Sequence, residues 1–315
     1  MNLLNNIKIG VLGGGVSSER EISLLSAQEA YKVFQRKSLN AVLIDIFTKE
    51  ESGVKAMINE NGIDLAFIAL HGEFGEDGKI QKILDDLGVP YTGSGSLASY
   101  LAMDKIVSKE IFMNKGIPTA NFKVYNASIH SEERLSGYLF KNLKYPLVVK
   151  PYFSGSSVGV SIVREEAGLE KALNSALSLQ PKVLIEDYIK GREFTVGILE
   201  EQALAVVEIV TKTEYFDFTT KYSDGLVEFI APAKLENEIY NKIQSVALAA
   251  HKALGCRHFS RVDILLGENN VPYVLEVNSI PGLTTHSLLP LSAKCCGIDF
   301  DELILKMASM VLDGQ

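Results

Sequence analysis

The chain has 315 residues, of which 47% are hydrophobic and 22% are charged, and it carries a formal net charge of −8. These values describe an ordinary globular protein that is long enough for two or three domains. The negative charge argues against nucleic acid or an anionic membrane as the main partner. No stretch approaches about 18 uninterrupted apolar residues, so the sequence predicts no membrane-spanning helix.

The cysteine content indicates neither a zinc site nor a disulfide framework. Cys256, Cys295 and Cys296 form no C-x-x-C pair, and two of them are adjacent. The first residues lack a charged segment followed by a long apolar run and a cleavage site. We therefore expect a location in the reducing cytoplasm.

The chain opens with a strand, a glycine-rich turn, a helix and a second strand. The strand is predicted at 7–12, and Ser18 and Glu21 form a capping-box pattern before a helix at 21–36. The second strand is expected at 41–46. A dinucleotide-binding fold has the same order, but Ser18 stands where the third glycine of its fingerprint belongs. The fingerprint is therefore incomplete.

A third strand is expected at 65–70, and the motif HGEFGEDG follows it directly, beginning with His71. Because ligands bind at the carboxyl edge of an open parallel sheet, His71 is a candidate site residue. A simple loop histidine is the alternative. A helix at 79–87 completes the first domain, and the segment 93–96 (GSGS) is the best linker candidate.

The next segment combines a lysine with a loop rich in glycine and serine. After a helix predicted at 96–114, a strand ends in Lys150, and the loop 154–159 leads into a strand at 160–163. Backbone N–H groups of such loops can bind phosphate oxygens. No G-x-x-x-x-G-K-[ST] motif occurs, so this loop is not a P-loop. Many such loops are simple hairpins, but the nearby Lys150 favours phosphate binding.

Further helices and strands are expected along the rest of the chain. They are a helix at 165–179, strands at 183–189, 194–199 and 203–209, and helices at 236–253 and 299–312. The polar segment 211–225 is a long loop, which is unusual in a compact domain unless it forms a lid.

Two strands with acidic residues are predicted at 262–266 and 273–277, joined by a polar turn. Because side chains alternate along a strand, Glu276 and Asn278 share a face, and Asp263 is placed on the partner strand. Three hard oxygen ligands then converge, and Mg²⁺ prefers such ligands beside nucleotide phosphates. A hairpin with solvated carboxylates is the alternative.

Arg261 favours the metal and phosphate interpretation, because it lies two residues before Asp263 on the same face. A guanidinium matches a phosphate or a developing oxyanion in shape and charge. The motifs R-x-D, E-x-N and PGLTTHS (281–287) resemble the metal and phosphate end of ATP-grasp ligases. PGLTTHS resembles the D-alanine–D-alanine ligase family in particular. GGGVSSEREIS, HGEFGEDG and GSSVG match that family in the same order along the chain.

The resemblance implies an α/β fold class, with α+β architecture in the ATP-grasp part. The implied domains are an N-terminal parallel-sheet domain at 1–95, a central ATP-grasp subdomain at 96–189, and a C-terminal subdomain at 190–315 with metal and lid residues. The two subdomains would clamp the nucleotide. The implied reaction joins two D-alanines through a D-alanyl phosphate, gives D-alanyl-D-alanine, ADP and phosphate, and serves peptidoglycan precursor synthesis.

The resemblance also implies the role of each site residue. Residues expected at the amino-acid substrates are Glu19, His71, Arg261, Gly282, Ser287 and Leu288. Residues expected at ATP are Lys105, Lys150, Ser156, Ser157, Glu186, Asp187, Ile189, Glu193 and Lys221. Residues expected to act in catalysis are Glu19, Ser156, Tyr222 and Arg261. Residues expected to hold two Mg²⁺ ions, for which Mn²⁺ can substitute, are Asp263, Glu276 and Asn278. A monovalent cation is a further candidate cofactor.

Tyr222 bears on the second substrate. By resemblance it hydrogen-bonds with Ser156 and Glu19, and a phenylalanine at its position is associated with D-alanine–D-lactate ligases. Tyr222 therefore favours an amine acceptor. The group that accepts the amine proton stays open between Tyr222, His71 and water. Without the resemblance, Glu19 would be a first-turn acid favoured by the helix dipole, and Glu186 and Glu193 would be surface charges.

Three alternative functions compete with this one. They are a D-alanine–D-lactate or other ATP-grasp carboxylate–amine ligase, a nucleotide-binding regulatory protein without catalysis, and a dinucleotide-dependent oxidoreductase. The intact Arg261 and acidic hairpin argue against the second, and the incomplete glycine fingerprint argues against the third. The expected partners are D-alanine, ATP and a second copy of the chain in a homodimer.

Overall fold

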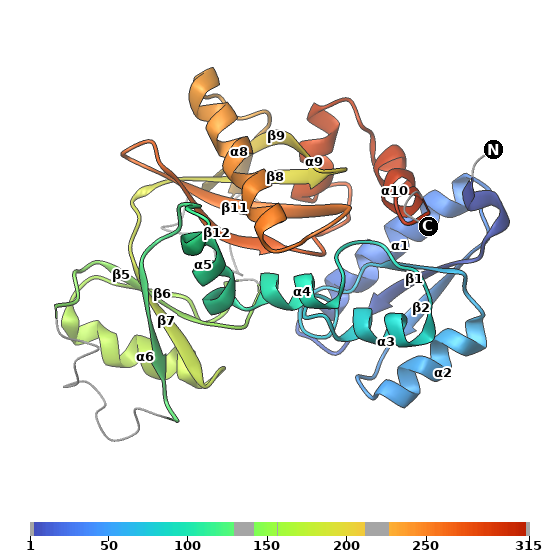
Figure 1. Cartoon of the computed structure of the whole chain (residues 1–315), viewed down its shortest axis with the longest axis horizontal. Helices are drawn as coiled ribbons and strands as arrows, with labels where there is room; N and C mark the ends of the chain where they lie inside the picture. Colours follow the sequence, from blue (N-terminus) through green and yellow to red (C-terminus); the bar gives the residue numbers. More distant parts are fainter. Residues whose placement is uncertain (1–2, 129–141, 156, 212–226, 313–315) are drawn as a thin grey trace.

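The computed structural model describes residues 3–128, 142–155, 157–211 and 227–312. In these residues the strands form a parallel sheet near the N-terminus and two antiparallel sheets (Figure 1). This arrangement confirms the predicted fold class. Within the same ranges, no helix combines the length and the apolar character that spanning a bilayer requires.

The parallel sheet has the order β2 (Ala41–Ile46), β1 (Ile9–Gly14) and β3 (Leu65–Ile68). Every residue of β1 is buried, because helices cover both faces of the sheet. Those helices are α1 (Arg20–Arg36) and α10 (Phe300–Ser309) on one face, and α2 (Glu51–Asn61) and α3 (Lys79–Leu87) on the other. The bounds of β2 and α3 confirm the predicted ranges. Strand β1 begins two residues after its predicted start, and α2 was not predicted.

The predicted capping box at the start of α1 is wrong. Glu19 is the N-cap residue, and no side chain caps the helix. The Ser17 hydroxyl instead accepts a hydrogen bond from the Glu19 amide (3.1 Å) and donates to the carbonyl of His71 (2.8 Å). The turn before α1 is therefore hydrogen-bonded to the loop after β3, and its side chains do not cap α1.

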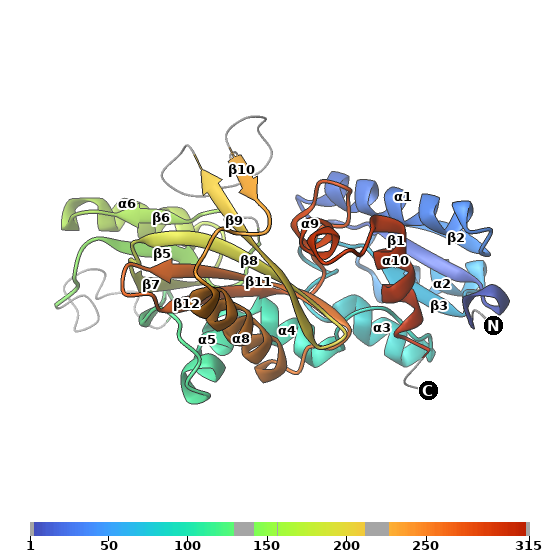
Figure 2. The same cartoon turned by 90° about the horizontal axis from the view of Figure 1, so that it is seen from above.

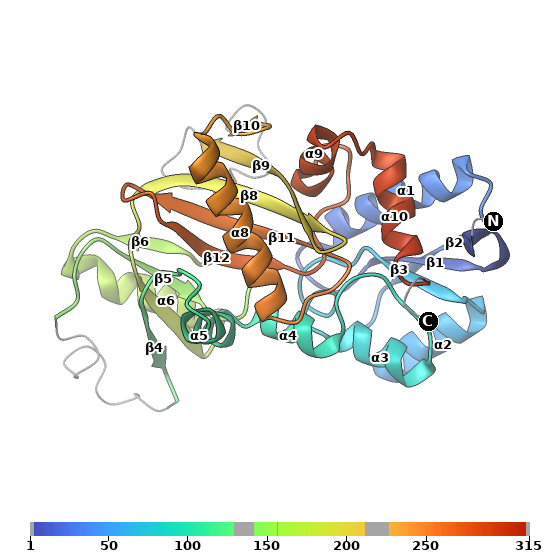
Figure 3. The ribbon, with the colours of Figure 1, turned by 45° about the horizontal axis from the view of Figure 1, so that its top comes forward.

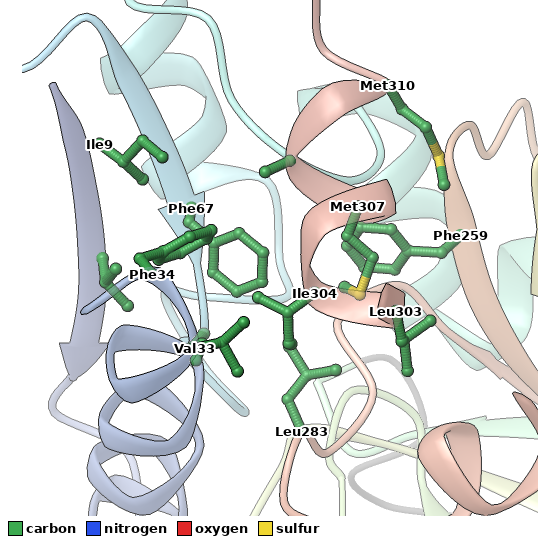
Figure 4. Packing of buried hydrophobic residues seen from close by; sticks show 14 of the residues in the cluster. Ile9, Val33, Phe34, Phe67, Phe259, Leu283, Leu303, Ile304, Met307 and Met310 are labelled. Atoms are coloured by element: carbon green, nitrogen blue, oxygen red, sulfur yellow. The ribbon is translucent and has the colours of Figure 1, made fainter. Parts of the chain in front are cut away.

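The core beside the parallel sheet includes side chains from the C-terminal end of the chain (Figure 4). Phe34 of α1 and Phe67 of β3 meet edge to face, with ring centroids 5.4 Å apart. Ile304 and Met307 of α10 pack in the same cluster, together with Phe259. The last helix thus joins the two ends of the chain.

Ile304→Ala is expected to lower the free energy of unfolding by about 2–5 kcal/mol, because Ile304 is fully buried and its loss leaves a cavity. Urea unfolding followed by circular dichroism measures this. Leu97→Ala is the control, because Leu97 is 71% exposed and its loss should change stability by less than about 0.5 kcal/mol. Equal losses in both variants would contradict the assigned core.

The four-stranded sheet has the order β4 (Phe122–Asn126), β7 (Lys182–Asp187), β5 (Leu147–Pro151) and β6 (Ser161–Val163). The short helix η3 (Glu166–Gly168) and α6 (Leu169–Leu177) replace the single helix predicted there, and α6 covers one face of the sheet. On the other face, Glu186 of β7 pairs with Val148 of β5, and Lys150 follows Val148 by two residues on the same face of β5. This face is therefore the charged one.

The five-stranded sheet has the order β10 (Val227–Ile230), β9 (Gln202–Thr211), β8 (Gly191–Leu199), β11 (Phe259–Gly267) and β12 (Pro272–Asn278). The hairpin of β11 and β12 confirms the prediction. Helix α8 (Asn237–Ala253) lies across one face, as Figure 3 shows. Helix α9 (Leu288–Cys295), which was not predicted, packs against β8 and β9. In Figure 2, the four-stranded and five-stranded sheets lie beside each other.

The single helix predicted at 96–114 is wrong, because Asp104 divides it. Helix α4 (Ser96–Met103) ends there, and α5 (Lys105–Asn114) begins at the next residue. The Asp104 backbone is extended, and its carboxylate accepts hydrogen bonds from the amides of Ile106 (3.0 Å) and Val107 (3.1 Å). This N-cap places Lys105 at the start of a helix. Both helices share the core of the five-stranded sheet.

Candidate functional site

A cavity of about 370 Å³ lies between the four-stranded and five-stranded sheets. This volume is within the range of about 300–1,000 Å³ that is usual for small-molecule sites. Its lining contains many of the predicted nucleotide and metal residues: Lys105, Lys150, Ser157, Glu186, Asp187, Ile189, Glu193, Asp263 and Glu276. A larger hollow of about 1080 Å³ beside α3 and α4 is lined by none of them. The smaller cavity is therefore the candidate site.

A buried charge cluster contributes Lys150 and Glu186 to the cavity lining. The Lys150 ammonium on β5 lies 2.9 Å from one carboxylate oxygen of Glu186, and Lys109 on α5 lies 3.2 Å from the other. Burial alone would raise the pKa of Glu186, but the two lysines outweigh it and hold the pKa below its usual value. Glu186 is thus a buried anion and not a surface charge. Sequence reasoning missed Lys109, although it lies one helical turn after Lys105.

The cavity lining also contains apolar side chains and the backbone at a strand end. Its apolar lining includes Val148, Ile162, Leu265 and Leu275. Asp187 and Ile189 lie at the end of β7 and just beyond it, where the ladder with β5 stops. The Asp187 carboxylate accepts a hydrogen bond from Asn121 (2.9 Å). Such an environment suits a flat aromatic base that is recognised along its polar edge.

The β11–β12 hairpin brings the predicted metal ligands together. Arg261 lies opposite Asn278, and Asp263 lies opposite Glu276. Arg261 donates to both carboxylate oxygens of Asp263 (2.9 and 2.8 Å), and the Asn278 amide donates to the same carboxylate (3.1 Å). Thr195 on β8 adds a hydrogen bond to Asp263 (2.6 Å). Asp263 is therefore held rigidly at the cavity wall.

The hairpin offers oxygen ligands of the type that Mg²⁺ binds. Within the described ranges, no three His, Cys, Asp or Glu side chains converge as a metal site of their own. Asp263 and Glu276 supply two carboxylates, and Asn278 supplies an amide oxygen. All are hard donors, and Mg²⁺ usually completes its shell with phosphate and water. The donor set therefore fits a metal that binds together with a nucleotide.

Lys105 joins the hairpin to the loop after β5. Its ammonium forms an ion pair with Glu276 (2.8 Å) and donates to the carbonyl of Ser154 (2.8 Å). In that loop, Ser157 has φ +56°, and Gly159 has φ +77°. The lysine lies where the loop and the acidic strand meet, and it lines the cavity. It can therefore contact an anion held between them.

Arg261 faces acids from both ends of the chain. Burial would lower its pKa, but Asp263, Glu276 and Glu76 raise the pKa above its usual value. Glu76 lies in the HGEFGEDG loop and accepts a hydrogen bond from the Gly72 amide (3.0 Å). Sequence reasoning did not single out Glu76, although the motif contains it. Arg261 therefore stays cationic between the two parts of the chain.

His71 is buried and fully engaged by the protein. Its ring nitrogens lie 2.8 Å from the Ser26 hydroxyl and 3.0 Å from the carbonyl of Ile280. The Ser26 hydroxyl also accepts a hydrogen bond from the Leu283 amide (3.3 Å). This network ties α1 and the loop after β3 to the loop that follows β12. The geometry favours a role for His71 in positioning that loop.

Glu19 lies where two loops approach each other. A Cβ atom added at Gly155 would come within 3.1 Å of the Glu19 carboxylate, and one at Gly72 would come within 3.6 Å. The loop after β5 and the loop after β3 therefore meet at Glu19. Three residues predicted to act nearby lie outside the described residues: Ser156, Lys221 and Tyr222.

The loop after β12 leads into α9 and carries the remaining predicted residues. A Cβ atom at Gly282 would lie 2.9 Å from the Ser287 hydroxyl, so a larger residue there would displace that hydroxyl. Ser287 is the N-cap residue of α9, and its hydroxyl accepts a hydrogen bond from the Thr284 amide (3.1 Å). Leu288 begins the helix, where backbone N–H groups lack helical partners and favour an anion.

Comparison with known families agrees with this geometry. Residues 111–309 match the model of the D-ala D-ala ligase C-terminus, and residues 47–94 match the model of the D-ala D-ala ligase N-terminus. The first match alone spans more than half of the chain.

The chain belongs to the D-alanine–D-alanine ligase family.

Individual family members match the chain over nearly its full length. A D-alanine–D-alanine ligase of Geotalea uraniireducens is 44% identical over 301 residues, which cover 96% of this chain and 94% of the relative. That of Geobacter sulfurreducens is 43% identical, with 99% and 97% covered. The predicted family is thus confirmed, and the chain is a ligase.

Two solved structures of such ligases resemble this one. The Bacillus anthracis D-alanine–D-alanine ligase complexed with ATP has a TM-score of 0.85 and 34% identity, and 98% of each chain is covered. The VanG D-Ala:D-Ser ligase of Enterococcus faecalis has a TM-score of 0.82 and 29% identity, with 97% of this chain and 99% of that chain covered. The fold is therefore shared over nearly all of the chain that the structure describes.

Proposed function

We propose that this ligase joins two D-alanines to D-alanyl-D-alanine, converts ATP to ADP and phosphate, and thereby supplies a peptidoglycan precursor. The observation that carries the proposal is one cavity lined by two lysines, Lys105 and Lys150, and by the hairpin acids Asp263 and Glu276. Within it, Lys105 forms an ion pair with Glu276 (2.8 Å). A nucleoside triphosphate requires cations that bind its phosphates and acids that hold its Mg²⁺. The likeness to a ligase solved with ATP supports the choice of nucleotide.

The first step activates a carboxylate, because joining a carboxylate to an amine is uphill in water. The carboxylate of the first D-alanine attacks the γ-phosphorus, and the bond to ADP breaks, which leaves a D-alanyl phosphate. Lys105 and Lys150 bind the phosphates. Asp263, Glu276 and Asn278 would hold Mg²⁺, which supplies charge neutralisation at the phosphates. It stays a prediction that two Mg²⁺ ions bind, that Mn²⁺ can replace them, and that a monovalent cation is a further cofactor.

The second step forms the peptide bond. The neutral amine of the second D-alanine attacks the acyl carbon, and the tetrahedral intermediate expels phosphate with its electron pair. The proton that the nitrogen gives up passes to a base, for which Tyr222, His71 and water stay the candidates. Arg261 and the Gly282 N–H stabilise the oxyanion of the tetrahedral intermediate. Glu19 binds the ammonium of the first D-alanine, while Ser287 and the Leu288 N–H bind the carboxylate of the second. These roles rest on the family motifs, and for Arg261 also on its hydrogen bond to Asp263 (2.8 Å), which lines the cavity.

The remaining predictions concern further nucleotide contacts in the cavity, residues outside the described ranges, and properties of the whole protein. Ser157, Glu186, Asp187, Ile189 and Glu193 are proposed to surround the nucleotide, since all of them line the cavity. Ser156, Lys221 and Tyr222 keep their sequence-based roles in catalysis and phosphate binding. The homodimer, the cytoplasmic location and the domain limits also stay predictions.

A different acceptor is the second candidate function. The D-Ala:D-Ser ligase among the structural relatives shows that this fold serves another acceptor. A D-alanine–D-lactate ligase is the further alternative, against which Tyr222 argues. All three share the activated first D-alanine, so only the second substrate distinguishes them.

A product assay by mass spectrometry with Mg·ATP and D-alanine tests the proposal. Parallel reactions contain L-alanine alone, D-alanine with D-lactate, and D-alanine with D-serine. We expect ADP, phosphate and D-alanyl-D-alanine as the main products wherever D-alanine is present, and no dipeptide from L-alanine. Preferential formation of the mixed product with D-serine or D-lactate would replace the proposed acceptor. ADP formation in no reaction would contradict ligase activity.

A further inference from the structure

Lys109 is a buried cation behind the cavity that the proposed mechanism does not use. Its side chain is 1% exposed, and it is absent from the cavity lining. Lys109 lies on α5, one turn after Lys105, so both lysines project from the same side of the helix. A lysine is almost never fully buried unless it is paired. Its burial here therefore points to a specific partner.

Three groups fix the Lys109 ammonium. It lies 3.2 Å from a carboxylate oxygen of Glu186 and donates to the Thr119 hydroxyl (2.7 Å). Thr119 in turn donates to the carbonyl of Val274 on β12 (2.8 Å). The Phe122 ring lies 5.5 Å from the ammonium, within the range of a cation–π contact. Lys109 thus has one defined position, between β7, β4 and β12.

Glu186 is shared between Lys109 and Lys150. Its other carboxylate oxygen lies 2.9 Å from the Lys150 ammonium, and Glu186 and Lys150 are 4% and 9% exposed. Burial lowers the pKa of Lys109 to about 8, and the attraction of Glu186 limits the fall, so that the ammonium form prevails at neutral pH. One negative charge therefore balances part of two positive charges.

We propose that Lys109 is a positioning residue for nucleotide phosphates, which acts through Glu186 on Lys150. Lys109 attracts one oxygen of Glu186 in an ion pair, which leaves the other oxygen directed toward Lys150. Because the carboxylate charge is shared, Lys150 keeps positive charge that it can offer to a phosphate in the cavity. Without Lys109, Lys150 is the remaining ion-pair partner of Glu186 in the described structure, and the carboxylate draws it away from the cavity. This inference rests on the proposed binding of ATP.

Lys109→Met removes the charge and keeps much of the volume. Its test compares the dissociation constants of Mg·ADP and adenosine, measured by displacement of a fluorescent nucleotide. We expect about tenfold weaker binding of Mg·ADP, by analogy with residues that orient metal ligands, whose loss costs about 10–100-fold in metal affinity. Adenosine binding should stay within about twofold of the wild type, because adenosine carries no phosphate. Lys115→Met, an exposed lysine at the end of α5, should change neither constant.

Three outcomes would overturn the inference. They are unchanged Mg·ADP binding by Lys109→Met, an equal loss of Mg·ADP and adenosine binding, and an equal effect of Lys115→Met. A wild-type protein that binds neither ligand would contradict the proposed function itself, and the inference with it.

A second variant decides the question if Lys109→Met does not fold. Thr119→Val removes the hydroxyl that accepts the Lys109 hydrogen bond and keeps the side-chain shape. We expect about threefold weaker binding of Mg·ADP and unchanged binding of adenosine, as the loss of one hydrogen bond suggests. Unchanged binding of Mg·ADP by Thr119→Val would overturn the inference.

Discussion

Arg261→Met is expected to lower kcat/KM by about 10²–10³, the usual loss when one oxyanion donor is removed. The physical reason is twofold. The guanidinium would no longer stabilise the tetrahedral intermediate, and Asp263 would lose the two hydrogen bonds that hold its carboxylate. Initial rates of ADP formation at varied D-alanine concentration measure the effect. The kcat/KM of Arg261→Lys should fall between those of the wild type and Arg261→Met, because lysine keeps the charge and loses the fork geometry.

Arg36→Met is the matched control for this prediction. Arg36 is half-exposed on α1, where it forms an ion pair with Asp301 of α10, away from the cavity. Its loss should leave kcat/KM within about twofold of the wild type, since exposed ion pairs contribute little. Wild-type kinetics of Arg261→Met would remove Arg261 from the oxyanion site.

Glu276→Gln should reduce Mg²⁺-dependent turnover by about 10²-fold, and by more than about tenfold at the least. Even the loss of a residue that only supports a metal ligand lowers metal affinity or activity by about 10–100-fold. The amide keeps the shape of the side chain and loses its charge. It also ends the ion pair with Lys105 (2.8 Å), which links the hairpin to the loop after β5. Turnover as a function of Mg²⁺ concentration, at fixed ATP and D-alanine, measures the loss.

Glu268→Gln provides the comparison within the same hairpin. Glu268 lies in the turn between β11 and β12, is 68% exposed, and pairs with Lys190 at the surface. This variant should follow the wild-type Mg²⁺ curve. If Glu276→Gln regained nearly wild-type activity at saturating Mg²⁺, Glu276 would not be a metal ligand.

The β11–β12 hairpin could be predicted because its signals are local. Alternating apolar residues, a polar turn and acids at fixed spacing determine strands, register and facing side chains together. Arg261, Asp263 and Glu276 consequently lie close to where the sequence placed them. The family motifs added candidate roles for these residues, which local patterning cannot supply.

The charge cluster around Glu186 could not be predicted, because its members come from separate elements. Alternation along β7 places Glu186 on one face, but it does not say that α5 brings Lys109 to that face. Burial on a sheet face depends on what packs there, and a single strand carries no such information. The sequence therefore left Glu186 open as a surface charge.

The division of the helix at Asp104 had a visible signal that a stronger pattern obscured. Aspartate is a favoured N-cap residue, but apolar residues continue on both sides and suggest one helix. The structure shows that the cap prevails, because the Asp104 carboxylate accepts two amide hydrogen bonds. Helix α9 is short and follows a loop, so periodicity was too brief to reveal it.

The most direct test of the proposed reaction follows oxygen from substrate to product. D-alanine labelled with ¹⁸O in both carboxylate oxygens is incubated with Mg·ATP and the enzyme, and the released phosphate is analysed by mass spectrometry. Attack of the carboxylate on the γ-phosphorus predicts one ¹⁸O atom in each phosphate. Unlabelled phosphate formed together with D-alanyl-D-alanine would contradict a D-alanyl phosphate and, with it, the proposed mechanism.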